Sequence, residues 1–140
     1  MMKHFRLGAL VAACLALSLP AFALDLSLDG TFRGNCGTGT ASGGAVTLNN
    51  KCGVVTTEVL TTLKDSEYSL TLTNSAIAAA DIVIAQVQNA LNTAGEPLIT
   101  RVTPAAGSVI IVVKNMLTGP LGTGASFNNT LKVSFFTIKP

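Results

Sequence analysis

The chain is poor in side chains that could carry out chemistry. It has one histidine, His4, and three cysteines among 140 residues. A Ser-His-Asp or Cys-His catalytic set needs a histidine beside the nucleophile, and zinc sites are built from several histidines and cysteines. Two carboxylate pairs, Asp25 with Asp29 and Asp65 with Glu67, are the nearest match to a hydrolytic dyad. Each pair lies in a predicted strand or turn, where such side chains face solvent. We therefore expect no catalytic residue, no cofactor and no metal.

Two motifs resemble known sites but fit structural roles better. Residues 25–30, Asp-Leu-Ser-Leu-Asp-Gly, match the opening of a calcium loop. The twelfth position of that loop should be a glutamate and is Cys36, while Leu26 and Leu28 alternate as in a strand. Residues 128–130, Asn-Asn-Thr, form a glycosylation sequon. We interpret them as a tight turn.

Residues 1–23 have the three parts of an export signal. Lys3, His4 and Arg6 give a positive start, residues 7–19 form an apolar run, and Ala-Phe-Ala at 21–23 offers small residues for cleavage. The apolar run is too short for a stable membrane span. The leader is typical of bacterial export. We therefore expect the mature chain, residues 24–140, outside the cytoplasm, secreted or at the cell surface.

A second interpretation of the leader stays open. Val-Ala-Ala-Cys at residues 11–14 resembles a lipoprotein cleavage box, which would place a lipid on Cys14. Cleavage there would leave an apolar stretch at residues 15–23 as the tether. The mass of the mature protein distinguishes the two outcomes.

Removal of the leader changes the charge and the cysteine count. The whole chain has nine basic and seven acidic residues, and Lys3 and Arg6 leave with the leader, so seven of each remain. A mature chain without net charge offers no electrostatic basis for binding nucleic acid or acidic lipid. Cys14 also leaves, so Cys36 and Cys52 remain. In an oxidising compartment we expect them to form a disulfide.

The hydrophobic pattern predicts an all-β fold. Five consecutive β-branched residues at 109–113 follow a Pro/Ala/Gly turn, which indicates a central strand buried on both faces. Tyr68, Leu70 and Leu72 alternate with serine and threonine, as in a half-buried strand. Further strands are expected at residues 24–28, 45–48, 54–63, 81–87, 98–102 and 130–138, with a Gly/Thr-rich loop at 35–44. About eight strands suit a single β-sandwich of the jelly-roll type.

Residues 74–91 are ambiguous. The alanine-rich stretch at 75–80 favours helix by propensity. The β-branched content of residues 81–87 favours a buried strand. We predict a helical turn followed by a strand, and one continuous helix is the alternative.

Two groups of apolar side chains are candidates for assembly contacts. In the last predicted strand Phe136 and Ile138 take the face opposite to Leu131, Val133 and Phe135, which indicates a bulge or burial on both faces. Residues 24–28, here called the leucine segment, begin at the new N-terminus, where the strand could pair with a neighbour's sheet edge. This resembles donor-strand exchange between pilus subunits, and the alternative is that the segment is the domain's own first strand. The assembly candidates are Leu24, Leu26, Leu28, Phe136 and Ile138.

Half of the chain resembles a β-sandwich module of phage tail and fibre proteins and, more distantly, the trimeric heads of the complement and tumour-necrosis-factor class. The resemblance covers residues 68–138 and is carried by residues 68–75, 102–109 and 129–135. Asn129 stands where the module usually has glycine. The export signal and the two cysteines are larger departures from it. The resemblance implies a structural part that trimerises, without catalytic residues.

The sequence therefore predicts an exported, non-enzymatic structural protein that self-associates into a surface or extracellular fibre or oligomer. The alternative is a secreted module that binds carbohydrate or another surface partner through the loop at residues 116–127. The chain has no tryptophan, and its one tyrosine, Tyr68, lies on the apolar side of its strand. It therefore lacks an outward-facing Trp or Tyr ring, on which a sugar usually stacks, and sugar binding would depend on the loop.

Overall fold

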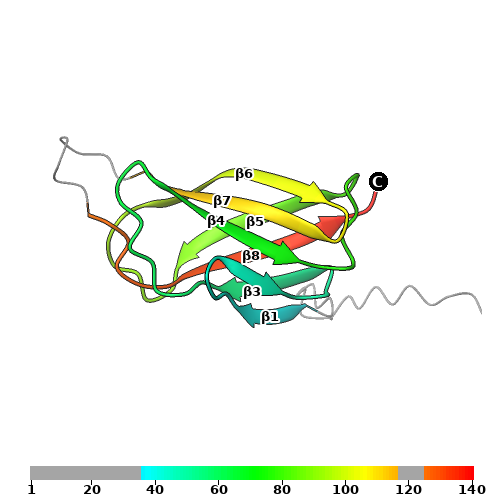
Figure 1. Ribbon diagram of the computed structural model, residues 1–140, viewed down its shortest axis with the longest axis horizontal. Coiled ribbons are helices and arrows are strands. Elements are labelled where there is room, and N and C mark those ends of the chain that lie inside the picture. Colours follow the sequence, from blue (N-terminus) through cyan, green and yellow to red (C-terminus); the bar gives the residue numbers. More distant parts are fainter. Residues whose placement is uncertain (1–35, 117–124) are drawn as a thin grey trace, which may run out of the picture.

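The computed structural model describes residues 36–116 and 125–140, and in them two four-stranded sheets are stacked face to face (Figure 1). One sheet has the order β1-β3-β8-β5 and the other the order β2-β4-β7-β6. They are called here the β8 sheet and the β7 sheet. The strands are β1 Gly37–Thr40, β2 Ala45–Thr47, β3 Cys52–Thr56, β4 Glu67–Thr73, β5 Ile82–Asn89, β6 Pro97–Ala105, β7 Ser108–Asn115 and β8 Leu131–Ile138. The all-β sandwich expected from the sequence is confirmed.

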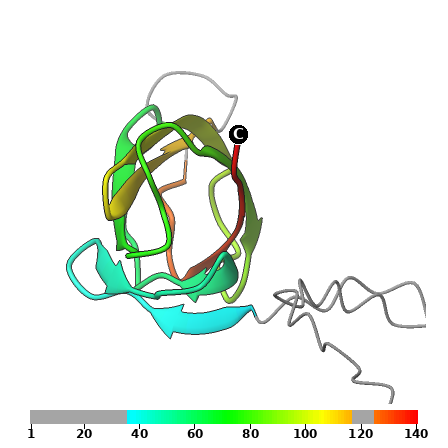
Figure 2. The ribbon, with the colours of Figure 1, turned by 90° about the vertical axis from the view of Figure 1, so that its right-hand side faces the viewer.

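The chain winds around the core by alternating between the two sheets. It crosses from one sheet to the other at every connection except the β6–β7 hairpin. The β1–β2 pair and the β3–β4 pair are two successive turns of this winding, so β1 lies parallel to β3 and β2 parallel to β4. The remaining sheet neighbours are antiparallel. Figure 2, which looks along the sandwich from one end, shows the two layers enclosing a single core.

Strand β7 lies between β4 and β6, as the run of β-branched residues predicted. Val109, Ile111 and Val113 point into the core and are fully buried. On the outer face Val112 is also buried, whereas Ile110 is 39% exposed. The prediction that this strand is buried on both faces is therefore confirmed at Val112 and wrong at Ile110.

Strand β8 alternates regularly along its whole length. Leu131, Val133 and Phe135 are buried, and Phe136 and Ile138 lie on the outer face. The pairings with β3 and β5 run without a shift, so the expected bulge is absent from β8. The described chain has its register shift in β6, between Ile99 and Arg101.

The ambiguous stretch forms turns followed by a strand. Two i→i+3 backbone bonds, from Ile77 N–H to the Asn74 carbonyl and from Asp81 N–H to the Ala78 carbonyl, replace the expected helical turn. The Asn74 and Asp81 side chains accept the N–H groups of Ala76 and Ala78. These local bonds compete with helical pairing. β5 begins at Ile82, so the continuous helix is ruled out.

Two further expectations need correction. The Gly/Thr-rich stretch at 35–44 contains strand β1, which the disulfide holds against β3. The strand expected at 54–63 ends at Thr56 as β3. Beyond it, the Thr57 N–H donates to the Leu131 carbonyl, and the Thr57 hydroxyl accepts a hydrogen bond from the Leu131 N–H, at the beginning of β8.

Strand β6 extends past Pro104. An edge strand tolerates this proline because its missing N–H is not needed there.

Several predictions fall on residues outside the described ones. These are the export signal at 1–23, the lipidation alternative at Cys14, the leucine segment at 24–28, and residues 117–124 of the Gly-rich loop.

Candidate interaction surface

Four apolar side chains form a continuous patch on the outer face of the β8 sheet. Ile82 and Ile84 of β5 lie directly opposite Ile138 and Phe136 of β8 in the antiparallel register. Directly opposite residues point to the same face of a sheet. Their exposed fractions are 56% for Ile82, 56% for Ile84, 37% for Phe136 and 39% for Ile138. These four residues are called here the apolar patch.

The patch covers one half of the outer face of the β5–β8 pair, and the other half of that pair is polar. The next pair along the two strands is Gln86 with Ser134, and the pair after it is Gln88 with Lys132. A shallow hollow at the border is lined by Ile84, Gln86, Ser134, Phe135 and Phe136. An open hollow on a flat sheet face suits a contact with another chain better than enclosure of a small ligand.

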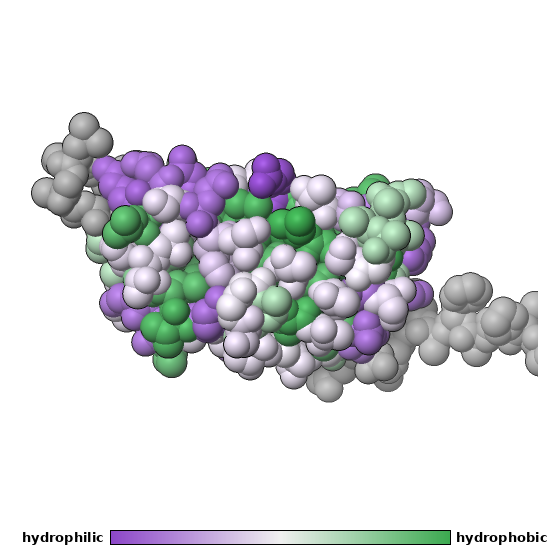
Figure 3. Space-filling view, viewed as in Figure 1, coloured by the Kyte–Doolittle hydropathy of each residue, from purple (hydrophilic) through white to green (hydrophobic). Residues whose placement is uncertain are grey.

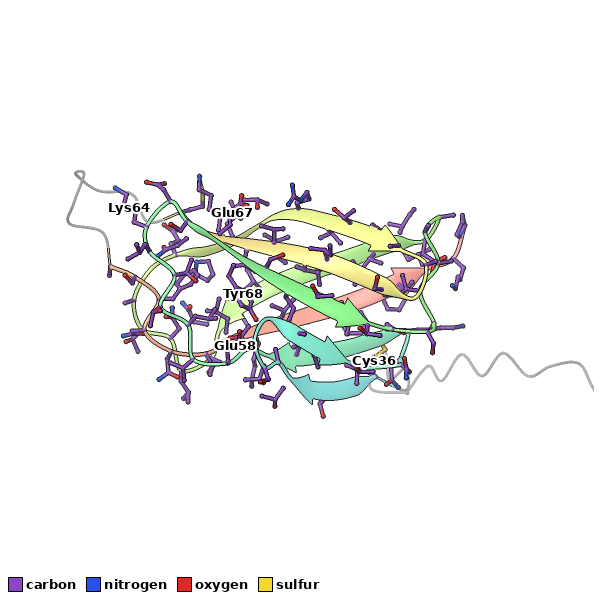
Figure 4. All side chains as sticks on the ribbon, in the orientation of Figure 1. Cys36, Glu58, Lys64, Glu67 and Tyr68 are labelled. Carbon is purple, nitrogen blue, oxygen red and sulfur yellow. A yellow bond between two sulfur atoms is a disulfide. The ribbon has the colours of Figure 1, made fainter. Side chains whose placement is uncertain are left out.

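The disulfide lies in the same row as the patch. Cys52 is opposite Phe136 on the β3 side of β8, and its sulfur is bonded to Cys36, with the two Cα atoms 4.6 Å apart. The expected Cys36–Cys52 disulfide is therefore present, and it ties the residue before β1 to the first residue of β3. Figure 4 places Cys36 at the end of the sandwich where β8 ends. The described part of the chain thus begins beside the apolar patch.

The outer face of the β7 sheet differs from this. Its exposed isoleucine, Ile110, lies between Thr71 and Thr103 in the register, so it has no apolar neighbour across the strands. Figure 3, viewed from this side, shows pale surface with several separate hydrophobic areas and a concentration of hydrophilic residues at the upper left. Single exposed apolar residues are ordinary on protein surfaces, whereas a continuous patch often marks a contact site.

A second set of exposed apolar side chains lies outside β5 and β8. Its members are in loops or beside them, and Met116 adjoins the part of the chain outside the description. They are Val59, Leu63, Leu91, Leu98 and Met116. Four of them lie outside the strands, and Leu98 lies opposite Lys114 on the outer face of the β7 sheet, so no strand register joins them into one row.

The half-buried Tyr68 is held by an acid that the sequence did not single out. The Tyr68 hydroxyl donates to Glu58 Oε2 at 3.1 Å, and the Gly44 N–H donates to Glu58 Oε1 at 2.8 Å (Figure 4). Burial, the negative charge of Glu58 and the hydrogen bond to it all raise the pKa of Tyr68 above its ordinary value. These two hydrogen bonds join the β1–β2 turn, the β3–β4 connection and β4. The Tyr68 hydroxyl and both oxygens of the Glu58 carboxylate take part in them. The pair therefore acts as a structural clamp.

The other polar groups singled out in the sequence also have structural surroundings. Asp65 and Glu67 are exposed at the β3–β4 connection, and Glu67 lies opposite Lys114 in the register. In the sequon the Asn128 amide nitrogen, the atom that would carry a glycan, donates to Thr93 Oγ1, and its oxygen accepts the Thr93 N–H. Asp25 and Asp29 lie outside the described residues.

Residues 36–116 and 125–140 contain no group of three or more His, Cys, Asp or Glu side chains that could hold a metal ion. No helix among the same residues is long and apolar enough to cross a membrane.

The structure brings together part of the predicted assembly set. Phe136 and Ile138 are adjacent on the outer face, while Leu24, Leu26 and Leu28 are not described. Sequence reasoning missed Ile82 and Ile84. Their strand was interpreted as buried because it is rich in β-branched residues, and the structure shows that Ile82 and Ile84 lie on its outer face, away from the core.

No protein-family model, curated protein or solved structure matches this chain.

Proposed function

We propose that the protein is an exported, non-enzymatic structural subunit that self-associates through the outer face of its β8 sheet. The observation that carries the proposal is the apolar patch, formed by Ile82, Ile84, Phe136 and Ile138 in two adjacent register pairs. Exposed apolar surface is favourably removed from water, and a flat sheet face can pack against a similar surface.

Three further features support this proposal. The Cys36–Cys52 disulfide agrees with an oxidising compartment outside the cytoplasm. The seven basic and seven acidic residues of positions 24–140 leave no net charge to keep copies apart. The likeness of residues 68–138 to modules of phage tails and fibres stays a prediction, and it points to the same class of role.

The carbohydrate-binding alternative gains no support. It depends on the loop at residues 116–127, most of which lies outside the description. Tyr68, the one tyrosine, is half buried and its hydroxyl is bonded to Glu58.

The test is the mass of the mature chain, residues 24–140, measured by size-exclusion chromatography with light scattering over a range of concentrations. We expect an oligomer or polymer for the unmodified chain and a folded monomer for the double variant Ile84→Ser, Phe136→Ser. The matched control is Ile110→Ser, because Ile110 is as exposed as Phe136 but lies on the other sheet. An unmodified chain that stays monomeric at high concentration would overturn the proposal.

A further inference from the structure

We infer that the leucine segment, residues 24–28, of one copy covers the apolar patch of the next. This inference rests on the proposed self-association and names the contact that produces it. It starts from the size of the patch, the spacing of the leucines, and the place where the chain enters the β8 sheet.

The patch alone is smaller than a standard interface. The four exposed fractions correspond to on the order of 400 Å² of accessible surface, about half of the roughly 800 Å² that each partner contributes to a stable interface. A short apolar strand is similar to the patch in size. Three leucines bury roughly 100 Å² of apolar surface each, to judge from the free energy of burying one.

The spacing of the leucines fits the spacing of the patch. Leu24, Leu26 and Leu28 alternate with Asp25, Ser27 and Asp29, so an extended segment has one apolar face and one polar face. Its leucines repeat every two residues, about 6.8 Å along an extended chain. The patch has the same repeat, because Ile82 and Ile84 are two residues apart on β5, as are Phe136 and Ile138 on β8. Leucines can therefore pack between the patch side chains while the acids stay in water.

The chain enters the described structure next to the patch. Cys36 is bonded to Cys52, which lies in the register row of Phe136 and Ile84. Seven residues, 29–35, separate the leucine segment from Cys36. Fully extended they reach at most about 25 Å. The disulfide therefore fixes the starting point of these residues, Cys36, in the row of Phe136 and Ile84 in every copy.

A second copy is the occupant that self-association requires. A leucine segment lying on its own patch would close the surface and leave the chain monomeric. When it lies on the next copy, each molecule gives one segment and receives another, which is a head-to-tail contact that repeats. Such a contact builds an open chain of subunits or closes into a ring.

The test mixes two variants of the mature chain that are each defective in one half of the contact. The donor-defective variant carries Leu24→Ser, Leu26→Ser and Leu28→Ser. The acceptor-defective variant carries Ile84→Ser and Phe136→Ser. We expect each variant alone to be monomeric, with a dissociation constant at least 100-fold weaker than that of the unmodified chain. An equimolar mixture should form a one-to-one heterodimer and nothing larger, because it contains one intact donor and one intact acceptor.

The controls separate loss of contact from loss of folding. Circular dichroism and thermal unfolding check that each variant folds, and Leu26→Ser alone replaces the triple variant if that one does not. The variant Asp25→Asn, Asp29→Asn changes the polar face of the same segment and should assemble like the unmodified chain.

The outcomes distinguish this inference from the proposed function. If the donor-defective variant still assembles, copies associate without the leucine segment, and the inference is overturned while the proposed function stands. The same conclusion follows if the unmodified chain assembles but two folded variants give no heterodimer. If the unmodified chain is monomeric, the proposed function fails first.

Discussion

Buried asparagine side chains close the two ends of the sandwich. At one end the Asn74 amide donates to the Asn50 carbonyl and accepts the Ala76 N–H. At the other end Asn115 is fully buried. Its amide donates to the Thr62 and Ala125 carbonyls, and its oxygen accepts the Glu96 N–H. Since irregular loops leave backbone groups unpaired, these side chains satisfy groups that no strand could reach.

The packing around Asn115 leads to a prediction at Gly95. Gly95 has φ +75°, and a Cβ placed there would lie 2.7 Å from Phe127 and 2.8 Å from the Asn115 side chain. Gly107 is a matched control, because it has φ +77° with nothing near its Cβ. We expect Gly107→Ala to lower the free energy of unfolding by about 1 kcal/mol, the cost of a left-handed residue with a side chain. Gly95→Ala should lower it by about 3 kcal/mol, since it also disturbs the core.

Urea unfolding of both glycine variants measures this difference. Equal losses of stability would mean that the Asn115 and Phe127 side chains move away without cost, and that the loops at this end are loosely held.

A second residue-scale prediction concerns pH. The Asp81 carboxylate accepts hydrogen bonds from Lys139 Nζ at 2.6 Å and from the Ala78 N–H at 2.7 Å. These hydrogen bonds, above all the one from Lys139, lower the pKa of Asp81 below its ordinary value of 3.8. A carboxyl whose pKa is lowered by folding stabilises the protein above its unfolded pKa, and the stabilisation disappears as the pH falls through the folded pKa.

Asp81→Asn should therefore destabilise the protein at neutral pH and make little difference at a pH well below 3.8. The measurement is the urea midpoint of both proteins from neutral to acidic pH. Asp65→Asn is the control, because Asp65 is exposed and asparagine tolerates its φ of +61°. A constant difference between Asp81→Asn and the unmodified protein at every pH would contradict the linkage.

At the scale of elements, the disulfide decides the place of β1. β1 has four residues, of which two are glycines and two threonines. It is an edge strand that pairs in parallel with β3. Such a short strand contributes little apolar burial, so the bond between Cys36 and Cys52 is its main anchor.

Replacing both cysteines, Cys36→Ser with Cys52→Ala, should lower the free energy of unfolding by about 3 kcal/mol, as expected for a loop of this length. The amides of β1 should lose protection from hydrogen exchange, while those of β7 and β8 keep it in proportion to the remaining stability. The experiment compares exchange in the oxidised protein and in the variant. Unchanged protection in β1 would mean that strand pairing alone holds it.

At the scale of the whole molecule, the self-association proposed above should be driven by apolar contact. Residues 24–140 have as many basic as acidic side chains, and none of the four patch residues is charged. Between roughly 50 and 500 mM sodium chloride we expect the association constant to change by less than about threefold, because exposed charges are screened over this range. Warming from about 5 to 25 °C should strengthen association, since apolar burial weakens on cooling.

Sedimentation velocity across these conditions tests the prediction. Dissociation by salt would show that ion pairs hold the copies together and that the patch is not the main contact.

Much of the fold could be predicted from the sequence, because alternation along a strand is a local property. Leu70, Leu72, Leu131, Val133 and Phe135 lie inward as their spacing indicates. Strand ends were harder to predict, since the apolar residues after Thr56 continue into an irregular loop. The hydrogen-bond partners of this loop are far away in the sequence. The Leu60 N–H, for example, donates to the Asn129 carbonyl.

The candidate site was predicted only in part, for the same reason. The departure of Phe136 and Ile138 from the buried face of their strand was visible in the sequence. Ile82 and Ile84 are as apolar as core residues, and they are exposed because they lie on the outer face of the β8 sheet, opposite Ile138 and Phe136. Glu58 and Tyr68 are ten residues apart, and the β3–β4 crossover brings them together.

The sequence by itself determined the class of this protein: an all-β chain with a cysteine pair that is oxidised and a shortage of titratable groups. These properties depend on residue type and local spacing, which do not change with the partners of a strand. The tertiary structure decided which apolar residues are left in water. The order of strands in a sheet places β5 beside β8, and that pairing turns two separate pairs of side chains into one surface.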